Sequence, residues 1–226
     1  MKRRIISFLL FLFCFEGFAQ DKNTFFTGFF PEVSFTKSLP NSNKLNFKVE
    51  NQHVIFDNRL TERPQFDHYR TDFMLFHDWK LNATQSMALG VFHRIQDGAN
   101  GNRLVQQFAF LNRLRGLRIA HRMRTDQTFT RGESVEVRFR YRLASEFPLN
   151  GSTLDPGEGY LLISNEPIFS LQGGEFNLEN RLVLSYGKLY AKNQKLEYAI
   201  DYRTDGFFNN NFRTRLWPKI SYFYNF

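Results

Sequence analysis

Arginine occupies three successive alternate positions, 138, 140 and 142, within 135–143 (VEVRFRYRL), and guanidinium groups could bind an anion there. The residues between the apolar ones are Glu136, Arg138, Arg140 and Arg142. Such a strict alternation predicts a β-strand with one apolar face and one charged face. Because guanidinium groups form paired hydrogen bonds with carboxylates and phosphates, the charged face is expected to bind acidic neighbours or an anion.

The same alternation returns in 196–203 (LEYAIDYR) and, less regularly, in 118–124 (RIAHRMR). Several strands therefore bring arginine and acidic residues onto one shared face. We favour a structural network of ion pairs over an anion site, with Glu179, Glu197 and Asp201 as the partners of the arginines in 138–142. The predicted network comprises Arg118, Arg122, Arg124, Glu136, Arg138, Arg140, Arg142, Glu179, Arg181, Glu197, Asp201, Arg203, Arg213 and Arg215.

Histidine and serine residues give weaker indications of chemistry. The histidines lack the paired spacing that holds a metal ion, so we expect no metal site and no cofactor; they are His53, His68, His77, His93 and His121. Some residues are of the types that a hydrolase uses, but they form no nucleophile motif and lack the spacing of a nucleophile and its general base. These residues are Ser164-Asn165-Glu166, Ser185, Asp67-His68 and His77-Asp78.

The first residues of the chain resemble a secretory signal peptide. Basic residues at 2–4 precede an apolar run at 5–15, and small residues up to Ala19 predict a signal peptide over 1–19. The mature domain, 20–226, then lacks the single cysteine, Cys14, so we expect neither a disulfide nor a thiolate site. The formal net charge of +8 would suit nucleic acid, but an exported chain rarely meets it.

The rest of the chain reads as strands separated by turns. The segments are longer than the ~5–6 residues typical of globular strands, and they reach the ~9–11 residues that cross a bilayer obliquely. No apolar run approaches the ~18 residues of a membrane-spanning helix. The candidate strands are 24–37, 44–56, 66–81, 86–97, 102–114, 117–128, 131–147, 158–170, 175–189, 194–206 and 211–226.

The composition and strand pattern together predict a closed, antiparallel, up-and-down transmembrane β-barrel of 10 to 12 strands with a charged lumen. Because bacterial single-chain barrels have even strand numbers, we expect ten or twelve strands. Either the segment interrupted at Pro31 is not a full strand, or 147–172 hides an extra one. Tight turns near Asn82, 115–116 and Asn193 are expected at one rim, and the longer loops 57–65, 97–102 and 167–174 at the other.

The apolar face of each strand is expected to face lipid. One arginine on that face costs roughly 2–4 kcal/mol at the bilayer midplane, so the arginines should point inward. The residues predicted to face lipid are Phe139, Tyr141, Leu182, Leu184, Tyr186, Tyr198 and Ile200. The chain ends on an aromatic residue, as barrel assembly signals do, and Trp79, Trp217, Tyr222 and Tyr224 suit an interfacial girdle. The alternative is an aromatic core in a soluble β-sandwich.

Several short segments resemble an outer-membrane family of Bacteroidota catalogued as domain of unknown function 2490, most clearly from about residue 66 onward. They are His121-Arg122-Met123-Arg124, Phe139–Arg142, Asn165-Glu166, Asn180-Arg181-Leu182 and Lys188-Leu189. Met123 and Thr125 depart from the family pattern, which has an acidic residue and a further arginine there. The resemblance implies a barrel and a location, without an activity.

The expected protein is therefore an outer-membrane barrel of a diderm bacterium, of unassigned role, with a largely occluded interior. A small-anion pore and a lipid or lipopolysaccharide hydrolase remain as alternatives. Expected partners are outer-membrane lipid, lipopolysaccharide and the barrel assembly machinery, with no nucleic acid and no second copy of the chain.

Overall fold

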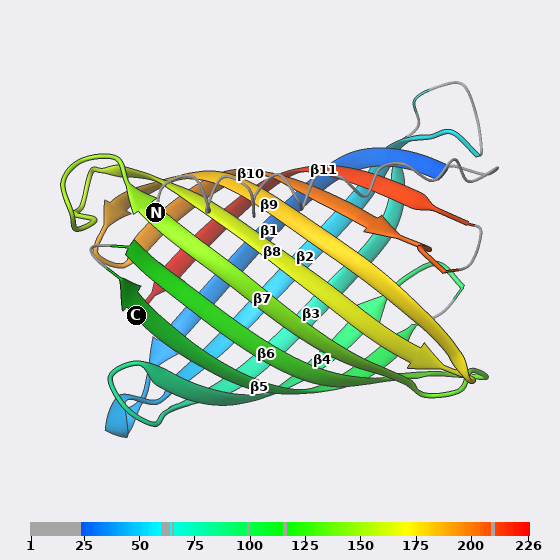
Figure 1. The fold of residues 1–226 in the computed structure, drawn as a ribbon, viewed down its shortest axis with the longest axis horizontal. Helices are drawn as coiled ribbons and strands as arrows, with labels where there is room; N and C mark the ends of the chain where they lie inside the picture. The colour runs from blue at the N-terminus through cyan, green and yellow to red at the C-terminus, as the bar shows by residue number, and fades with distance from the viewer. Residues whose placement is uncertain (1–23, 60–63, 65, 99, 115–116, 209–210) are drawn as a thin grey trace.

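The computed structural model describes residues 24–226 apart from 60–63, 65, 99, 115–116 and 209–210. The expected signal peptide over 1–19 lies outside these residues. The described residues form eleven strands and one short 3-10 turn, η1 (Pro40–Ser42) (Figure 1). The strands are β1 (Thr24–Ser38), β2 (Lys44–Asp57), β3 (Asp67–Lys80), β4 (Gln85–Ile95), β5 (Gly101–Leu114), β6 (Leu117–Thr130), β7 (Glu136–Pro148), β8 (Gly159–Gln172), β9 (Glu175–Ala191), β10 (Gln194–Asp205) and β11 (Arg213–Asn225). No helix with the length and apolar composition of a membrane span occurs in the described part of the chain.

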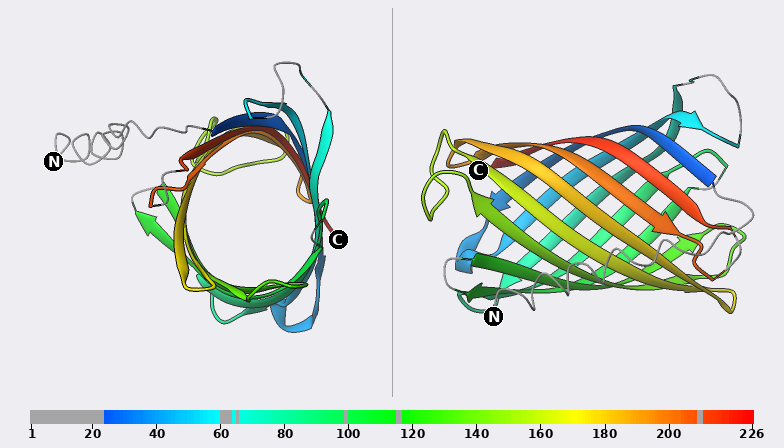
Figure 2. Two further views of the ribbon diagram at one scale, coloured as in Figure 1. Left: turned by 90° about the vertical axis from the view of Figure 1, so that its right-hand side faces the viewer. Right: turned by 45° about the horizontal axis from the view of Figure 1, so that its top comes forward.

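The strands close into a barrel because β1 pairs with both β2 and β11. Consecutive strands are antiparallel neighbours, so the predicted up-and-down order is confirmed for β1 to β11. The closing pair is different: β1 and β11 run parallel, with Phe26 opposite Arg215 and Val33 opposite Tyr222. Figure 2 shows the resulting ring in a view along the barrel.

The parallel seam corrects the expected strand count. Eleven strands lie within the predicted range of 10 to 12, but the argument that the number must be even was wrong. An even number is needed only when every neighbouring pair is antiparallel, and β1–β11 is not. Pro31 lies within β1, opposite Ile220 of β11, so the first segment is a full strand.

We predicted tight turns at one end of the barrel and longer loops at the other, but the connections at the two ends differ less in length than that. The C-terminal rim, defined by Phe226 and the connections 39–43, 81–84, 149–158 and 192–193, does group the turns at Asn82 and Asn193 (Figures 1 and 2). It also carries the ten-residue connection 149–158. The N-terminal rim is defined by Thr24 and the connections 96–100, 131–135 and 173–174.

The predicted loop 167–174 is wrong, because β8 continues to Gln172. Gly173 and Gly174 then reverse the chain with φ values of 58° and 87°. Glycine adopts positive φ without the steric penalty of other residues, so two glycines are enough for this turn.

Side chains alternate between an apolar outer face and a largely polar inner face. On β7, Val137, Phe139 and Leu143 are more than 40% exposed, whereas Arg138 and Arg140 are below 10%. Among the described residues, more of the buried side chains are polar or charged than apolar. The barrel is therefore inside-out relative to a soluble β-barrel, whose apolar residues fill the interior.

Two apolar clusters interrupt the polar interior. One, here the aromatic plug, consists of the buried residues Phe26, Phe30 and Trp217 with partly buried Tyr69. The ring of Trp217 meets Phe26 edge-on at 5.7 Å and Phe30 at 6.4 Å between centroids. Trp217 is 0% exposed, so its predicted place in an outer girdle was wrong. It shares the inward side of β11 with Arg215 and Lys219, as the period of two requires.

The second cluster lies on β3, β4 and β5. Its buried residues are Met74, Phe76, Ala88, Phe92 and Val105. Phe76 and Phe92 meet edge-on with ring centroids 5.5 Å apart. Phe76 lies directly opposite Gly90, and a Cβ at Gly90 would come within 2.3 Å of the Phe76 ring. The Phe76 ring can therefore occupy this position only because Gly90 has no side chain.

Candidate functional site

The interior wall formed by β6, β7 and β8 brings several arginines around one carboxylate, Glu166. Arg122 donates from Nη2 to Oε1 of Glu166 at 2.7 Å, and Arg140 donates from Nη2 to Oε2 at 2.8 Å. Glu166 is 5% exposed. Charged hydrogen bonds of this length strongly favour the ionised carboxylate, so Glu166 fastens two neighbouring strands to β8.

A second buried carboxylate, Asp126, lies further along the same wall. Arg138 donates from Nε to Oδ1 of Asp126 at 2.6 Å, and Arg103 Nε lies 3.4 Å from the same oxygen. Arg140 Nη1 lies 3.9 Å from Oδ2, so Asp126 and Glu166 are linked through Arg140. Glu136 is a weaker partner of Arg138, at 3.8 Å.

Four arginines of this wall face one another directly, and we call Arg122, Arg124, Arg140 and Arg142 the arginine quartet. The register places Arg122 opposite Arg142 and Arg124 opposite Arg140. Arg124 donates to Gln107 Oε1 at 2.6 Å and lies over the Phe76 ring at 5.0 Å, without a carboxylate in reach among the described residues. Like charges in directly opposed positions destabilise a sheet. The four positive charges of the quartet are therefore only partly balanced by nearby carboxylates.

The wall formed by β9, β10 and β11 is organised differently, because each arginine there has a carboxylate close by. Asp201 accepts two hydrogen bonds from Arg203, at 2.9 and 2.6 Å. Arg181 donates to Glu179 at 2.6 Å. Asp205 accepts two hydrogen bonds from Arg213, both at 2.9 Å, and one from Arg215. Arginine–carboxylate pairs of this kind balance the positive charge of this wall locally.

The remaining interior charges lie on β1 to β4. Arg94 donates to both oxygens of Asp72, at 2.7 and 2.8 Å. Glu32 accepts hydrogen bonds from Lys219 at 2.7 Å and from Lys48 at 3.0 Å. Lys219 also lies 4.4 Å from the centre of the Phe30 ring, so the aromatic plug is bordered by cations.

The partners predicted for the strand 135–143 were wrong. Arg138 and Arg140 bind Asp126 and Glu166, whereas Glu179 and Asp201 belong to the other wall. Glu197 accepts a hydrogen bond from the hydroxyl of Tyr160 at 2.6 Å. Arg118 lies near the C-terminal rim, 3.7 Å from Glu146, and its side chain is 51% exposed.

Sequence reasoning missed the carboxylates that matter most for the arginine quartet. Asp126 lies two residues beyond Arg124 on the same face of β6, which the period of two could have indicated. The sequence alone indicated Glu166 only as a possible residue of a hydrolase. Its contacts with Arg122 and Arg140 depend on the pairing of β6, β7 and β8. Asp72, Asp205 and Glu32 also lay outside the predicted network.

The residues considered for hydrolysis do not come together. Asn165 donates its amide to Asn180 Oδ1 at 3.0 Å, while Glu166 is held by the two arginines. His68 contacts Thr71, and His121 contacts Tyr141 at 2.7 Å and stacks on Phe110. In the ranges that the structure describes, no three histidine, cysteine or acidic side chains are grouped so as to hold a metal ion.

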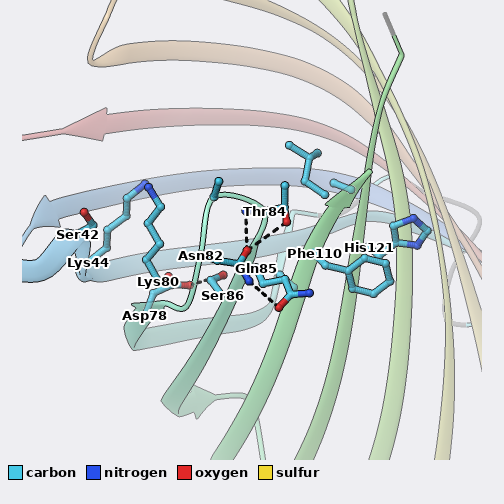
Figure 3. A pocket seen from close by; sticks show the side chains of 14 residues that line it. Ser42, Lys44, Asp78, Lys80, Asn82, Thr84, Gln85, Ser86, Phe110 and His121 are labelled. Atoms are coloured by element: carbon cyan, nitrogen blue, oxygen red, sulfur yellow. Dashed lines mark hydrogen bonds between the residues drawn. The ribbon is translucent and has the colours of Figure 1, made fainter. Parts of the chain in front are cut away.

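An open pocket of about 270 Å³ lies at the C-terminal rim. Lys44 and Lys80 border it on one side, and Phe110 and His121 border it on the other (Figure 3). The pocket also reaches Ala109 and Ala120. Ala109 is the register partner of Arg122, so the inner end of the pocket lies next to the quartet.

The family model described as "Protein of unknown function (DUF2490)" matches residues 27–222. No curated protein and no solved structure matched the chain.

Proposed function

Since the chain belongs to the family described as "Protein of unknown function (DUF2490)", we propose a role from its geometry: a monomeric outer-membrane β-barrel with a closed, ion-paired interior. Its host is a diderm bacterium, and the resemblance of its motifs favours a member of the Bacteroidota. The single observation that carries the proposal is the inverted distribution of side chains, with apolar residues outside and charged residues inside.

The outer face supports insertion into lipid. Leu184, Tyr186, Tyr198 and Ile200 of adjoining strands are each more than 40% exposed. Water would not favour so much exposed apolar surface on a monomer, whereas hydrocarbon does. The strands that the structure describes also form a closed hydrogen-bonded ring in which each has two neighbours, which is the condition for crossing a bilayer with strands.

The interior supports a closed barrel over a pore. The aromatic plug packs Trp217 against Phe26 and Phe30, and all three are at most 1% exposed. On the opposite wall, Glu166 and Asp126 bind arginines from neighbouring strands. A path for ions would have to break these contacts, so the geometry favours an occluded interior.

The proposed partners follow from the outer face and the last strand. Lipid and lipopolysaccharide contact the apolar outer face. The barrel assembly machinery recognises β11, on which Leu216, Ile220 and Tyr222 share the outward side with Tyr224. Export requires the signal peptide predicted over 1–19.

A pair of arginine substitutions tests the membrane assignment. Ile200→Arg places a charge on the outer face in the middle of β10, and we expect it to reduce folding into bilayers by about 2–4 kcal/mol. Leu149→Arg is the matched control, because Leu149 is 51% exposed in the connection 149–158 at the C-terminal rim. We expect the control to change folding by less than about 1 kcal/mol.

The measurement is the fraction of protein that is membrane-integrated and heat-modifiable on gels. Equal effects of the two substitutions, or recovery of the wild-type chain in the soluble fraction, would contradict a membrane-inserted barrel.

A further inference from the structure

The arginine quartet carries more positive charge than its surroundings neutralise. Its four members have two carboxylates within ion-pairing distance among the described residues: Glu166, which binds Arg122 and Arg140, and Asp126, which lies 3.9 Å from Arg140. Arg124 is held by the neutral Gln107. Arg142 has neither a hydrogen bond nor an ion pair to a described residue.

Donors within the quartet remain unused. The Nε atoms of Arg122 and Arg140 are buried and have no hydrogen-bond partner among the described residues. Arg140 is itself 7% exposed. A buried donor without an acceptor is destabilising, and more so when it is charged. An acceptor that binds here would therefore remove an existing penalty.

The wall of β9, β10 and β11 differs from the quartet in its carboxylates, although Arg203 Nη1 and Arg215 Nε there are also buried without a hydrogen-bond partner among the described residues. There, Arg181 and Arg203 also lie opposite each other, but Glu179 and Asp201 sit two residues away on the same strands and bind them. The quartet lacks such alternation on β7, where three successive inward positions are arginine. The carboxylates that reach these arginines come from the neighbouring strands β6 and β8, and no carboxylate of a described residue forms an ion pair with Arg142.

We infer that the arginine quartet binds a compact oxyanion of the phosphate class inside the barrel. Forked guanidinium donors on two neighbouring strands match the tetrahedral arrangement of phosphate oxygens. The excess positive charge favours a dianion over a single carboxylate. This site adds a ligand to the proposed closed barrel and does not require that ions cross it.

The C-terminal rim offers a route to the site. Ala120 of β6 lies opposite Ala144 of β7, two residues from Arg122 on the side of the C-terminal rim, and Ala109 of β5 lies opposite Arg122 itself. Their small side chains leave space inside the barrel here, and Ala109 and Ala120 line the pocket of about 270 Å³. Lys44 and Lys80 at its mouth would attract an anion, although Asp78 lies beside them.

Thermal unfolding of the detergent-folded full chain tests the inference, with inorganic phosphate as the probe at low millimolar concentration and constant ionic strength. We expect phosphate to raise the midpoint of unfolding of the wild-type protein by about 2–4 °C. Arg124→Gln and Arg142→Gln should each abolish this rise. Both should fold without phosphate, because each removes a like-charge repulsion.

Arg213→Gln is the matched control. It removes one arginine near the N-terminal rim, where Arg215 still binds Asp205. Its phosphate-dependent rise should equal that of the wild-type protein. The inference is overturned if neither inorganic phosphate nor phosphatidic acid, tested in the second arm below, raises the midpoint of the wild-type protein, or if all variants respond alike, which would indicate a general salt effect only.

A second arm identifies the source of the phosphate group. Phosphatidic acid is added to the micelles in place of inorganic phosphate. A rise that depends on Arg124 and Arg142 with inorganic phosphate assigns a free phosphate, and one seen only with phosphatidic acid assigns a lipid headgroup. A heat-modifiable barrel that responds to neither contradicts the anion site while leaving the membrane assignment intact.

Discussion

At the scale of single residues, the charge balance of the arginine quartet depends on Glu166. This carboxylate comes from β8 and reaches Arg140 on β7 and Arg122 on β6. Its removal would leave buried arginines without their closest counter-charge. Breaking a buried ion pair from one side usually costs about 3–5 kcal/mol, because the remaining charge stays buried.

We predict that Glu166→Gln lowers the free energy of unfolding of the detergent-folded barrel by about 3–5 kcal/mol. Denaturant unfolding followed by intrinsic fluorescence measures the change. Glu133→Gln serves as the control, since Glu133 lies in the exposed connection 131–135 and should change stability by less than about 0.5 kcal/mol.

Adding Arg142→Gln to Glu166→Gln should restore part of the loss, because it removes one of the uncompensated charges. A double variant that is less stable than Glu166→Gln alone would argue against like-charge repulsion within the quartet.

The sequence predicted the inward direction of these arginines but not their partners. Direction follows from the period of two within one strand, so Arg138 and Arg140 could be oriented without any knowledge of the fold. A partner depends on the register between strands, and a shift of one residue exchanges the two faces. No local pattern could therefore indicate that Glu166 meets Arg122, which lies 44 residues away.

At the scale of elements, inward glycines determine where the interior rings lie. Gly90 sits opposite Phe76, and Gly187 sits opposite Tyr160 on the neighbouring strand. A Cβ at either glycine would come within 2.3 Å of the facing ring. An aromatic ring that covers a strand glycine stabilises the pair and fixes the register.

We predict that Gly90→Ala destabilises the barrel by about 1–3 kcal/mol, since the added methyl group would force the Phe76 ring to move. Phe76→Ala should cost about 3–5 kcal/mol, because a buried ring is lost. A double-mutant cycle monitored by denaturant unfolding should show coupling of at least about 0.5 kcal/mol, because the added methyl finds space once the ring is gone. Additive effects would contradict direct contact between the two positions.

Strand positions were predictable from sequence to a greater extent than strand ends. The turns at Asn82 and Asn193 and the alternation within 194–206 placed β3, β4, β9 and β10 closely. The start of β7 was predicted at 131 but lies at Glu136, because alternation cannot separate an extended connection from a paired strand. Trp217 was assigned by its residue type instead of its parity along β11, which is why its position was missed.

At the scale of the whole molecule, the apolar and ionic contacts of the interior act together to close the barrel. The aromatic plug lies on the wall that includes β1, β3 and β11, and the arginine quartet lies on the wall of β6 and β7. Between them, β3, β4 and β5 contribute the second apolar cluster around Phe76 and Phe92. The closed state therefore depends on several strands at once.

We predict that the wild-type protein gives no current steps in planar bilayers at any salt concentration. The double variant Phe30→Ala, Trp217→Ala should produce discrete steps, because it removes two of the buried rings of the plug. The matched control, Tyr186→Ala, Tyr198→Ala, removes two outward rings and should remain silent. Steady conductance of the wild-type protein would contradict an occluded interior.

Barrel class and inward charge followed from composition and alternation, but the way in which the barrel closes did not. Nothing within β1 or β11 specifies that they pair in parallel, since closure depends on the number of strands between them. The same limit applies to the proposed phosphate-class site, because only the alignment of β6 with β7 sets arginine opposite arginine.

The parallel seam has a consequence for engineering the chain. Because the eleven described strands alternate in direction along the chain, β1 begins at one rim and β11 ends at the other (Figure 2). The separation corresponds to the length of β11, 13 residues or about 40 Å along the strand at ~3.3 Å per residue. Circular permutation, which works readily where chain ends adjoin, would here need a linker running the full height of the barrel through its interior or along its outer wall.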